Sequence, residues 1–124
     1  MEQLILHLIG DYITQTNKMA TEKTKDSYWA IIHAWIYGLP FLWLGTYRAV
    51  GLIVLTHFLI DRFRLARYVV FVKNKITEPS LKWDDCKTTG YHKDVPAWMS
   101  VWLMIIADNT LHLAINYLVL KFVR

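Results

Sequence analysis

The stretch VGLIVLTHFLID, residues 50–61, carries one histidine and one aspartate near the end of an apolar run. His57 and Asp61 are four residues apart, so on a helix they lie on one face, one turn from each other. Polar and ionisable groups are costly in apolar surroundings. The stretch therefore predicts a buried helix whose polar face has a structural or functional use.

The same spacing occurs twice more in the chain. His7 and Asp11 lie in the first apolar run, and Asp108 and His112 lie in the last one, in reversed order. The chain has five His and seven Asp residues, and random placement would give only ~0.5 such pairs. If the helices at 49–73 and 97–121 run antiparallel, the reversed pair points in the same spatial direction as His57 and Asp61. The remaining apolar run carries a lone histidine, His33.

Composition favours a small membrane protein. The chain has 124 residues, of which 55% are hydrophobic and 15% aromatic. Most Lys and Arg residues fall within 18–25 and 62–93, outside the apolar runs, which is typical of a polytopic membrane protein with one domain, residues 1–124. The net charge of +4 comes with no long basic stripe, so no nucleic-acid partner is expected. A single cysteine, Cys86, excludes an intrachain disulfide and a cysteine-based zinc site.

The apolar runs predict an all-α bundle of about four membrane helices, over residues 2–20, 28–44, 49–73 and 97–121, with a polar loop over 74–96. The positive loops 18–25 and 62–96 are expected on the cytoplasmic side of the bacterial inner membrane. The partners expected are the lipid bilayer and further copies of the chain, because three or four spans bury a polar layer poorly by themselves.

The polar residues inside these runs predict a metal site. Imidazole and carboxylate are the ligands that zinc, or alternatively manganese or iron, uses where cysteine is absent. The set is large enough for two ions that share a bridging carboxylate. The candidate ligands are His7, Asp11, His33, His57, Asp61, Asp108 and His112, with Gln15 and Asn116 as partners that orient them.

Other interpretations of the same residues stay open. The histidine–aspartate pairs also suit a metal-free hydrogen-bond network between helices or a proton relay. Arg62 and Arg64 follow Asp61 and are expected to anchor the helix at the membrane surface; a contact with an anionic phosphate headgroup is the alternative.

Three motifs together resemble the domain-of-unknown-function 3307 family of small bacterial and phage membrane proteins. They are HLIGDYITQ at 7–15, His33, and THFLIDR at 56–62, and the resemblance covers most of residues 1–73. The His-x-x-x-Asp pattern is also similar to that of membrane-bound metal-dependent hydrolases, and more distantly to helical zinc enzymes that hydrolyse phosphodiesters. Those zinc enzymes use an N-terminal tryptophan as a ligand, which this sequence lacks near its start.

The resemblance to the domain-of-unknown-function 3307 family itself implies no established activity. The similarity to metal-dependent hydrolases implies an integral-membrane, metal-dependent hydrolase, and a site at membrane depth favours a lipid or lipid-linked phosphoester as its substrate. One aspartate would serve as a base and the others as ligands, and the sequence leaves open which. Two alternatives compete with this expectation. The first is a non-enzymatic phage or bacterial effector that acts on host defence or on the envelope through a host protein, and the second is a proton- or ion-conducting oligomer.

Overall fold

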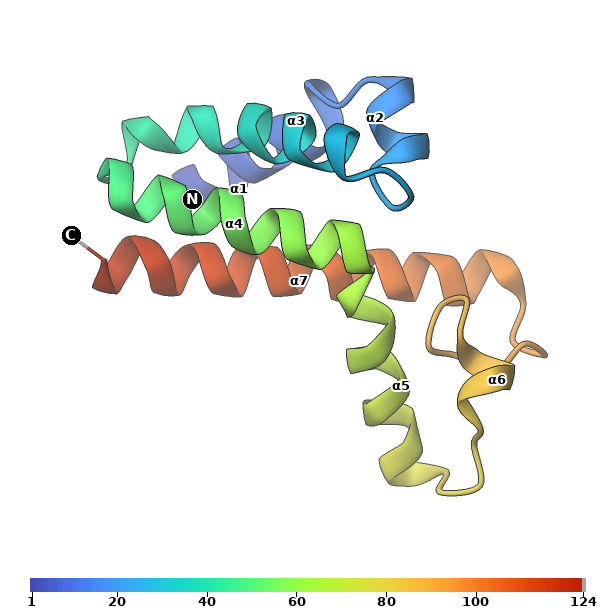
Figure 1. Cartoon of the computed structure of the whole chain (residues 1–124). Helices are drawn as coiled ribbons and strands as arrows, with labels where there is room; N and C mark the ends of the chain where they lie inside the picture. Colours follow the sequence, from blue (N-terminus) through green and yellow to red (C-terminus); the bar gives the residue numbers. More distant parts are fainter. Residues whose placement is uncertain (124) are drawn as a thin grey trace. The chain divides into compact units, whose positions relative to one another are not determined.

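The computed structural model describes residues 1–123, whose regular elements are all helices joined by turns and loops, with no strand among them, so the all-α prediction is confirmed. Figure 1 shows the helices α1 (Glu2–Leu8), α2 (Asn17–Glu22), α3 (Ser27–Gly38), α4 (Tyr47–Phe63), α5 (Leu65–Thr77), α6 (Trp83–Cys86) and α7 (Ala97–Phe122). A π-helical segment, η1 (Ile9–Ile13), follows α1, and a 3-10 segment, η2 (Leu39–Trp43), follows α3.

The chain forms two compact units. The first comprises Met1–Phe63 with His112–Arg124, and the second comprises Arg64–Leu111, so α7 contributes to both. The prediction of a single domain stays a prediction, because the compactness of each unit does not show whether the two fold together.

The predicted helix over 2–20 is wrong in its extent. The helix that begins at Glu2 ends with η1 at Ile13, and a new helix, α2, begins at Asn17 and extends into the predicted loop 18–25. Thr16 separates them, because its backbone is extended (φ −75°, ψ 162°) and its side chain caps α2 by accepting from the Met19 N–H. Threonine is a favoured residue at such a cap.

Two further helix boundaries differ from the prediction. In the run 28–44, α3 ends at Gly38 and η2 continues through Pro40, which lacks the N–H that an α-helix would need. In the run 49–73, Arg64 adopts a left-handed backbone (φ 52°, ψ 49°), which ends α4 and separates it from α5. The predicted loop 74–96 contains the end of α5 and the short helix α6.

Among residues 1–123, α7 is the one helix that is long and apolar enough to cross a membrane. The prediction of a four-helix polytopic bundle is therefore not confirmed. The reason lies in the breaks described above, which leave α3 with 12 residues and α4 with 17. A transmembrane helix needs about 20 apolar residues.

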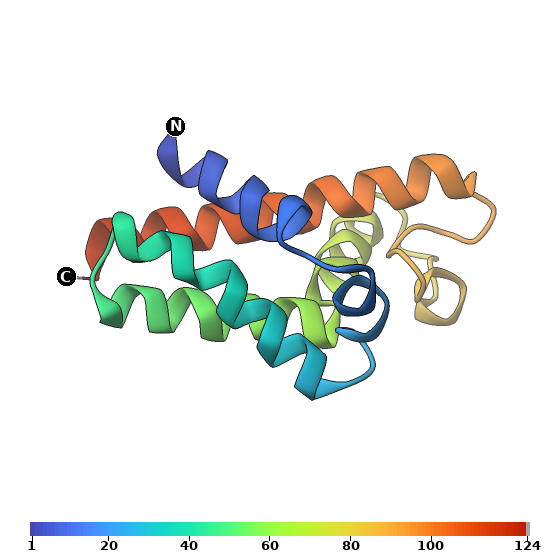
Figure 2. The same ribbon diagram turned by 90° about the horizontal axis from the view of Figure 1, so that it is seen from above.

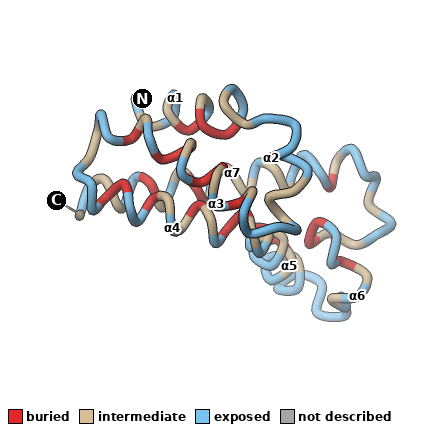
Figure 3. Tube along the Cα trace, turned by 45° about the horizontal axis from the view of Figure 1, so that its top comes forward, coloured by how far each residue is buried: buried red, intermediate tan, exposed pale blue. Residues whose placement is uncertain are grey.

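The first unit is built around two antiparallel helices. Figures 1 and 2 show α3 and α4 side by side, joined by η2, and Figure 3 shows that buried positions recur along both helices between exposed ones. Tyr37 and Phe41 from the α3–η2 segment pack with Val50 and Ile53 from α4. Leu6, Val54, Val119 and Leu120 pack around this core.

Gly10 lets η1 approach α3 closely. A Cβ atom at Gly10 would lie 2.5 Å from Cδ2 of Tyr37, which is closer than side chains tolerate. The missing side chain therefore brings the neighbouring residue, Asp11, toward the polar side chains of α3 and α4.

Candidate metal centre

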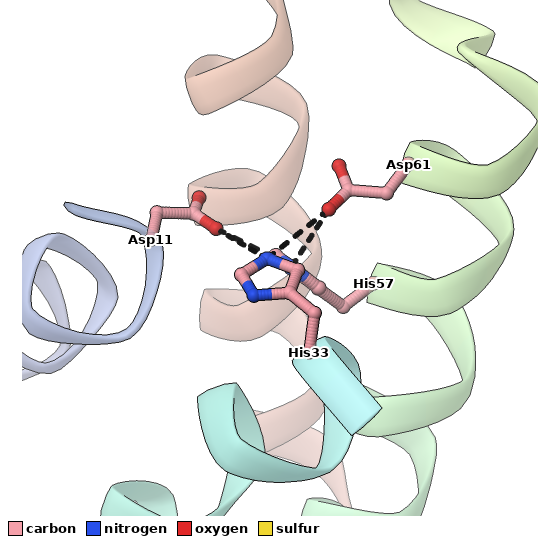
Figure 4. Close-up of side chains that lie close together, drawn as sticks. All are labelled: Asp11, His33, His57 and Asp61. Atoms are coloured by element: carbon pink, nitrogen blue, oxygen red, sulfur yellow. Dashed lines mark hydrogen bonds and ion pairs between the residues drawn. The ribbon is translucent and has the colours of Figure 1, made fainter. Parts of the chain in front are cut away.

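Four buried side chains from three elements of the first unit converge on one point. Asp11 comes from η1, His33 from α3, and His57 and Asp61 from α4, as Figure 4 shows. Their exposed fractions are 7%, 0%, 1% and 6% respectively. The predicted pair of His57 and Asp61, one turn apart on α4, supplies half of this cluster, which we call the His/Asp centre.

The atoms at its middle lie at similar distances from one another. Nε2 of His33 is 3.2 Å from Oδ1 of Asp11 and 3.3 Å from Oδ2 of Asp61. Nε2 of His57 is 3.3 Å and 3.1 Å from the same two oxygens. The two Nε2 atoms are 3.0 Å apart.

These spacings match the edges of a metal-ligand tetrahedron. A tetrahedral zinc ion with ligands about 2.0–2.1 Å away holds neighbouring ligand atoms about 3.3 Å apart. Five edges of the His/Asp centre measure 3.0–3.3 Å. Two imidazole nitrogens and two carboxylate oxygens, with no cysteine, also suit manganese and iron. The His/Asp centre can therefore hold a divalent metal ion.

A metal-free hydrogen-bond network would not satisfy the contacts that these histidines make. Each Nε2 atom has either one proton or one lone pair, yet each faces two carboxylates and the other imidazole. Meanwhile the Nδ1 atoms of His33 and His57 are buried without a hydrogen-bond partner among residues 1–123. The concentration of contacts at Nε2 is what a shared cation at the middle would produce.

Two other predicted ligands lie behind the carboxylates. Nε2 of His112 is 3.3 Å from Oδ1 of Asp61, and Nδ1 of His7 is 3.5 Å from Oδ2 of Asp11. Each aspartate thus directs one oxygen to the His/Asp centre and the other to a second histidine. In this arrangement His7 and His112 orient the carboxylates. The seventh predicted ligand, Asp108, lies on the part of α7 that belongs to the second unit.

Tyr37 connects these residues and was not among the sequence predictions. Its ring stacks on the His57 ring at a centroid distance of 3.7 Å and an angle of 16°. Its hydroxyl accepts a 2.6 Å hydrogen bond from Nδ2 of Asn116 and lies 2.8 Å from Nδ1 of His7. Asn116 therefore supports the centre through Tyr37. Tyr37 lies four residues after His33, on the same face of α3, which is the signal that would have identified it.

Gln15, the other predicted supporting residue, is not on the helix that carries His7 and Asp11. It lies beyond the end of η1, and its Oε1 atom is buried without a hydrogen-bond partner in the part of the chain that the structure describes. The prediction for Gln15 assumed one continuous helix over residues 2–20, and the helix ends at Ile13.

Lys23 reaches the centre from the end of α2. Its Nζ donates to Oδ2 of Asp61 at 2.7 Å and lies 3.3 Å from Nε2 of His33. The lysine side chain is 18% exposed, so it extends from the surface to the buried carboxylate. A positive charge thus stands beside an oxygen that a metal ion would also use. The sequence pattern missed it because Lys23 lies in a polar segment where basic residues are normally solvated.

Arg62 and Arg64 bind backbone and side-chain groups of their own units. Arg62 donates from Nε to Oγ of Ser27 at 3.1 Å and from Nη1 to the Thr24 carbonyl at 2.9 Å. Arg64 donates from Nη2 to the Thr88 carbonyl at 2.8 Å. These bonds connect the two arginines to the loops around residues 24–27 and 88. The predicted contact with a phosphate headgroup stays a prediction.

Titratable groups in the predicted loop 74–96 have ordinary roles. Lys93 donates to Oδ1 of Asp85 at 2.7 Å, and this hydrogen bond lowers the pKa of Asp85 and raises the pKa of Lys93. His92 pairs with Asp94 at 3.2 Å. Burial raises the pKa of the free Cys86 thiol, which makes it a poor nucleophile.

Comparison with known proteins identifies a family. No curated protein and no solved structure matches the chain. A family model described as "Protein of unknown function (DUF3307)" matches residues 1–123, which extends the predicted resemblance beyond residues 1–73 to α7 with Asp108 and His112. By this match over almost its whole length, the chain belongs to the DUF3307 family.

Proposed function

We propose that this protein is a membrane-embedded, metal-dependent hydrolase that acts on a phosphoester, with zinc as the expected ion. The observation that carries the proposal is the convergence of two imidazole nitrogens and two carboxylate oxygens at the edge lengths of a metal-ligand tetrahedron. A divalent ion bound there supplies a water of lowered pKa and polarises a phosphoryl oxygen.

The membrane location is supported by the uncovered apolar surface. Only 11% of the apolar window of α7 is buried, whereas the core helix of a water-soluble protein is mostly covered. In the first unit, α3 and α4 also leave large apolar side chains exposed, among them Trp35, Leu55 and Leu59. A lipid environment, or further copies of the chain within it, accounts for these faces. On this proposal α3 with η2 and α4 also lie in the bilayer.

The phosphoester preference is supported by Lys23. An ammonium group held at the edge of a metal centre suits an anionic phosphoryl oxygen, because it adds positive charge where negative charge develops. Hydrolysis needs an open coordination position. Asp61 would be the residue placed to yield one, since its Oδ1 lies 3.3 Å from Nε2 of His112 and its Oδ2 can return to Lys23 when it leaves the ion.

Metal content and activity test the proposal together. The protein is purified in detergent, its bound metal is measured by elemental analysis, and hydrolysis of bis(4-nitrophenyl) phosphate and of phospholipid vesicles is followed. We expect stoichiometric zinc, manganese or iron, and hydrolysis that His57→Ala abolishes and His92→Ala, in a partly exposed polar loop, leaves intact. A protein without transition metal, whose properties His57→Ala does not change, contradicts the proposal.

A second candidate is a non-enzymatic membrane protein with a structural metal. It is favoured by the closed set of four protein ligands, which is typical of structural zinc sites. Stoichiometric metal without hydrolysis of any phosphoester, together with loss of thermal stability on chelation, would favour this alternative.

A further inference from the structure

Helix α5 presents an apolar stripe outward. Leu65, Tyr68, Val69, Val72 and Ile76 recur at the spacing of one helix face, and all five are exposed, with Ile76 at 76% and Val72 at 60%. In a helix of a water-soluble protein such a stripe faces the core. Here Leu65, Val69, Val72 and Ile76 are uncovered, and Tyr68 at the edge of the stripe stacks on Trp83 of α6 at a centroid distance of 4.7 Å.

The opposite side of α5 is the one that the second unit covers. Val70 is buried against Gly90, where an added Cβ atom would lie 2.7 Å from Cβ of Val70. Nδ2 of Asn74 donates to the Gly90 carbonyl at 3.1 Å, and Nη1 of Arg67 donates to the Lys87 carbonyl at 2.9 Å. The segment after α6 therefore packs on the more polar face and leaves Leu65, Val69, Val72 and Ile76 of the stripe free.

Basic side chains border the stripe on both sides. At 100° per residue, Lys75 falls along one edge of the stripe and Lys73 along the other. Residues 64–96 carry seven Lys and Arg against four Asp and Glu. An apolar face with basic edges is the pattern of a helix that lies in the interface of an anionic membrane.

Helix α5 is too short to cross a membrane. Its 13 residues extend about 20 Å, which is too short for a hydrocarbon core of about 30 Å. The same compact unit holds the first half of α7, where Trp98 and Trp102 are 72% and 63% exposed, as in the aromatic belt of a membrane span. A unit that contains the start of a span is kept at the membrane surface.

We infer that α5 lies in the plane of the membrane, with Leu65, Val69, Val72 and Ile76 in the acyl–headgroup boundary and Lys73 and Lys75 against anionic headgroups. This inference rests on the membrane location proposed above and is independent of the metal. It adds a lipid-binding surface that senses the charge of the leaflet.

Site-directed spin labelling of the full chain tests the inference. Single cysteines at Val69, Val72 or Ile76, in a Cys86→Ala background, carry a nitroxide in nanodiscs of mixed phosphatidylcholine and phosphatidylglycerol. We expect these labels to collide more with oxygen than with a water-soluble nickel chelate. A label at Thr77, on the other face, should show the reverse ratio.

A label at Ile106 on α7 separates the two proposals. Oxygen preference at Ile106 with nickel preference along the α5 stripe overturns the inference and leaves the membrane location intact. Nickel preference at Ile106 overturns the membrane location itself. Protection of the stripe from both reagents, with spin–spin broadening, shows that a second copy of the chain covers it and also overturns the inference.

Lipid charge provides an independent readout. Because each lysine near an anionic surface contributes about a fivefold change in binding, Lys73→Glu should shift the stripe labels toward the nickel chelate, as should nanodiscs of phosphatidylcholine alone. Lys87→Glu, in the turn after α6 and away from the stripe, should leave them in place. Stripe labels that do not respond to either change overturn the role of the basic edges.

Discussion

The replacement Lys23→Met addresses whether the lysine and a divalent ion compete for Asp61. Nζ of Lys23 lies 2.7 Å from Oδ2 of Asp61, which is also one of the four atoms of the His/Asp centre. Two unit positive charges 4 Å apart repel by about 4 kcal/mol at an effective dielectric constant of 20. Binding of a divalent ion therefore requires the ammonium group to withdraw from Asp61.

The expected gain in metal affinity follows from the loss of the hydrogen bond between Lys23 and Asp61. A hydrogen bond to a charged group contributes about 1.5–3 kcal/mol, and each 1.4 kcal/mol is about a tenfold change in affinity. Lys23→Met removes this competing bond while keeping most of the side-chain volume. Metal affinity should rise roughly 10- to 100-fold. The ion-free protein should lose stability, because the buried carboxylates of Asp11 and Asp61 then lack their nearest permanent cation.

Both effects can be measured on the detergent-solubilised protein. Zinc affinity is obtained by competition with a chromogenic chelator, and thermal stability is measured in excess chelator. Lys25→Met is the matched control, because Lys25 is exposed two residues away and should change neither quantity. Unchanged or weakened zinc affinity in Lys23→Met would refute the reasoning that the lysine and the metal share Asp61.

Three further predictions concern the centre and its support. His57→Ala should reduce bound zinc from roughly one ion per chain to none, and His92→Ala should retain it, as measured by elemental analysis. Gly10→Ala should destabilise the fold by about 1–3 kcal/mol because its Cβ would collide with Tyr37. Gly51→Ala, whose Cβ meets nothing within 4 Å, should stabilise α4 by about 0.5–1 kcal/mol. The melting temperatures of the two variants should therefore shift in opposite directions. Tyr37→Phe removes the hydroxyl that accepts from Asn116 and should cost about 1–3 kcal/mol in denaturant unfolding while leaving the zinc content unchanged.

The chemistry of the centre could be predicted from local spacing. His57 and Asp61 meet in space because residues four apart on one helix are neighbours, and this holds wherever the helix packs. His33 could be predicted as a candidate ligand because it is an ionisable residue in an apolar run, where such residues rarely occur without a partner. Asp11 followed from the same rule applied to the first apolar run.

The points at which helices end could not be predicted from periodicity. The left-handed backbone at Arg64 follows no preference of arginine, and it divides a run that is continuous in its apolar pattern. The end of the first helix at Ile13 leaves Gln15 outside the helix on which it was predicted to orient the ligands. In both cases the backbone conformation of one or two residues decides where the helix ends, and the hydropathy pattern does not indicate that conformation.

The sequence by itself determined the helical class, the family and the pairing of histidine with aspartate, because these depend on residues close together in the chain. Only the tertiary structure decided which candidates share one point. It brings Asp11 and His33 to His57 and Asp61, and it places His7 and His112 behind the carboxylates. It also brings Lys23, 38 residues away from Asp61 in the chain, to within 2.7 Å of that carboxylate. Contacts between distant residues depend on how helices turn and pack, and no local pattern specifies them.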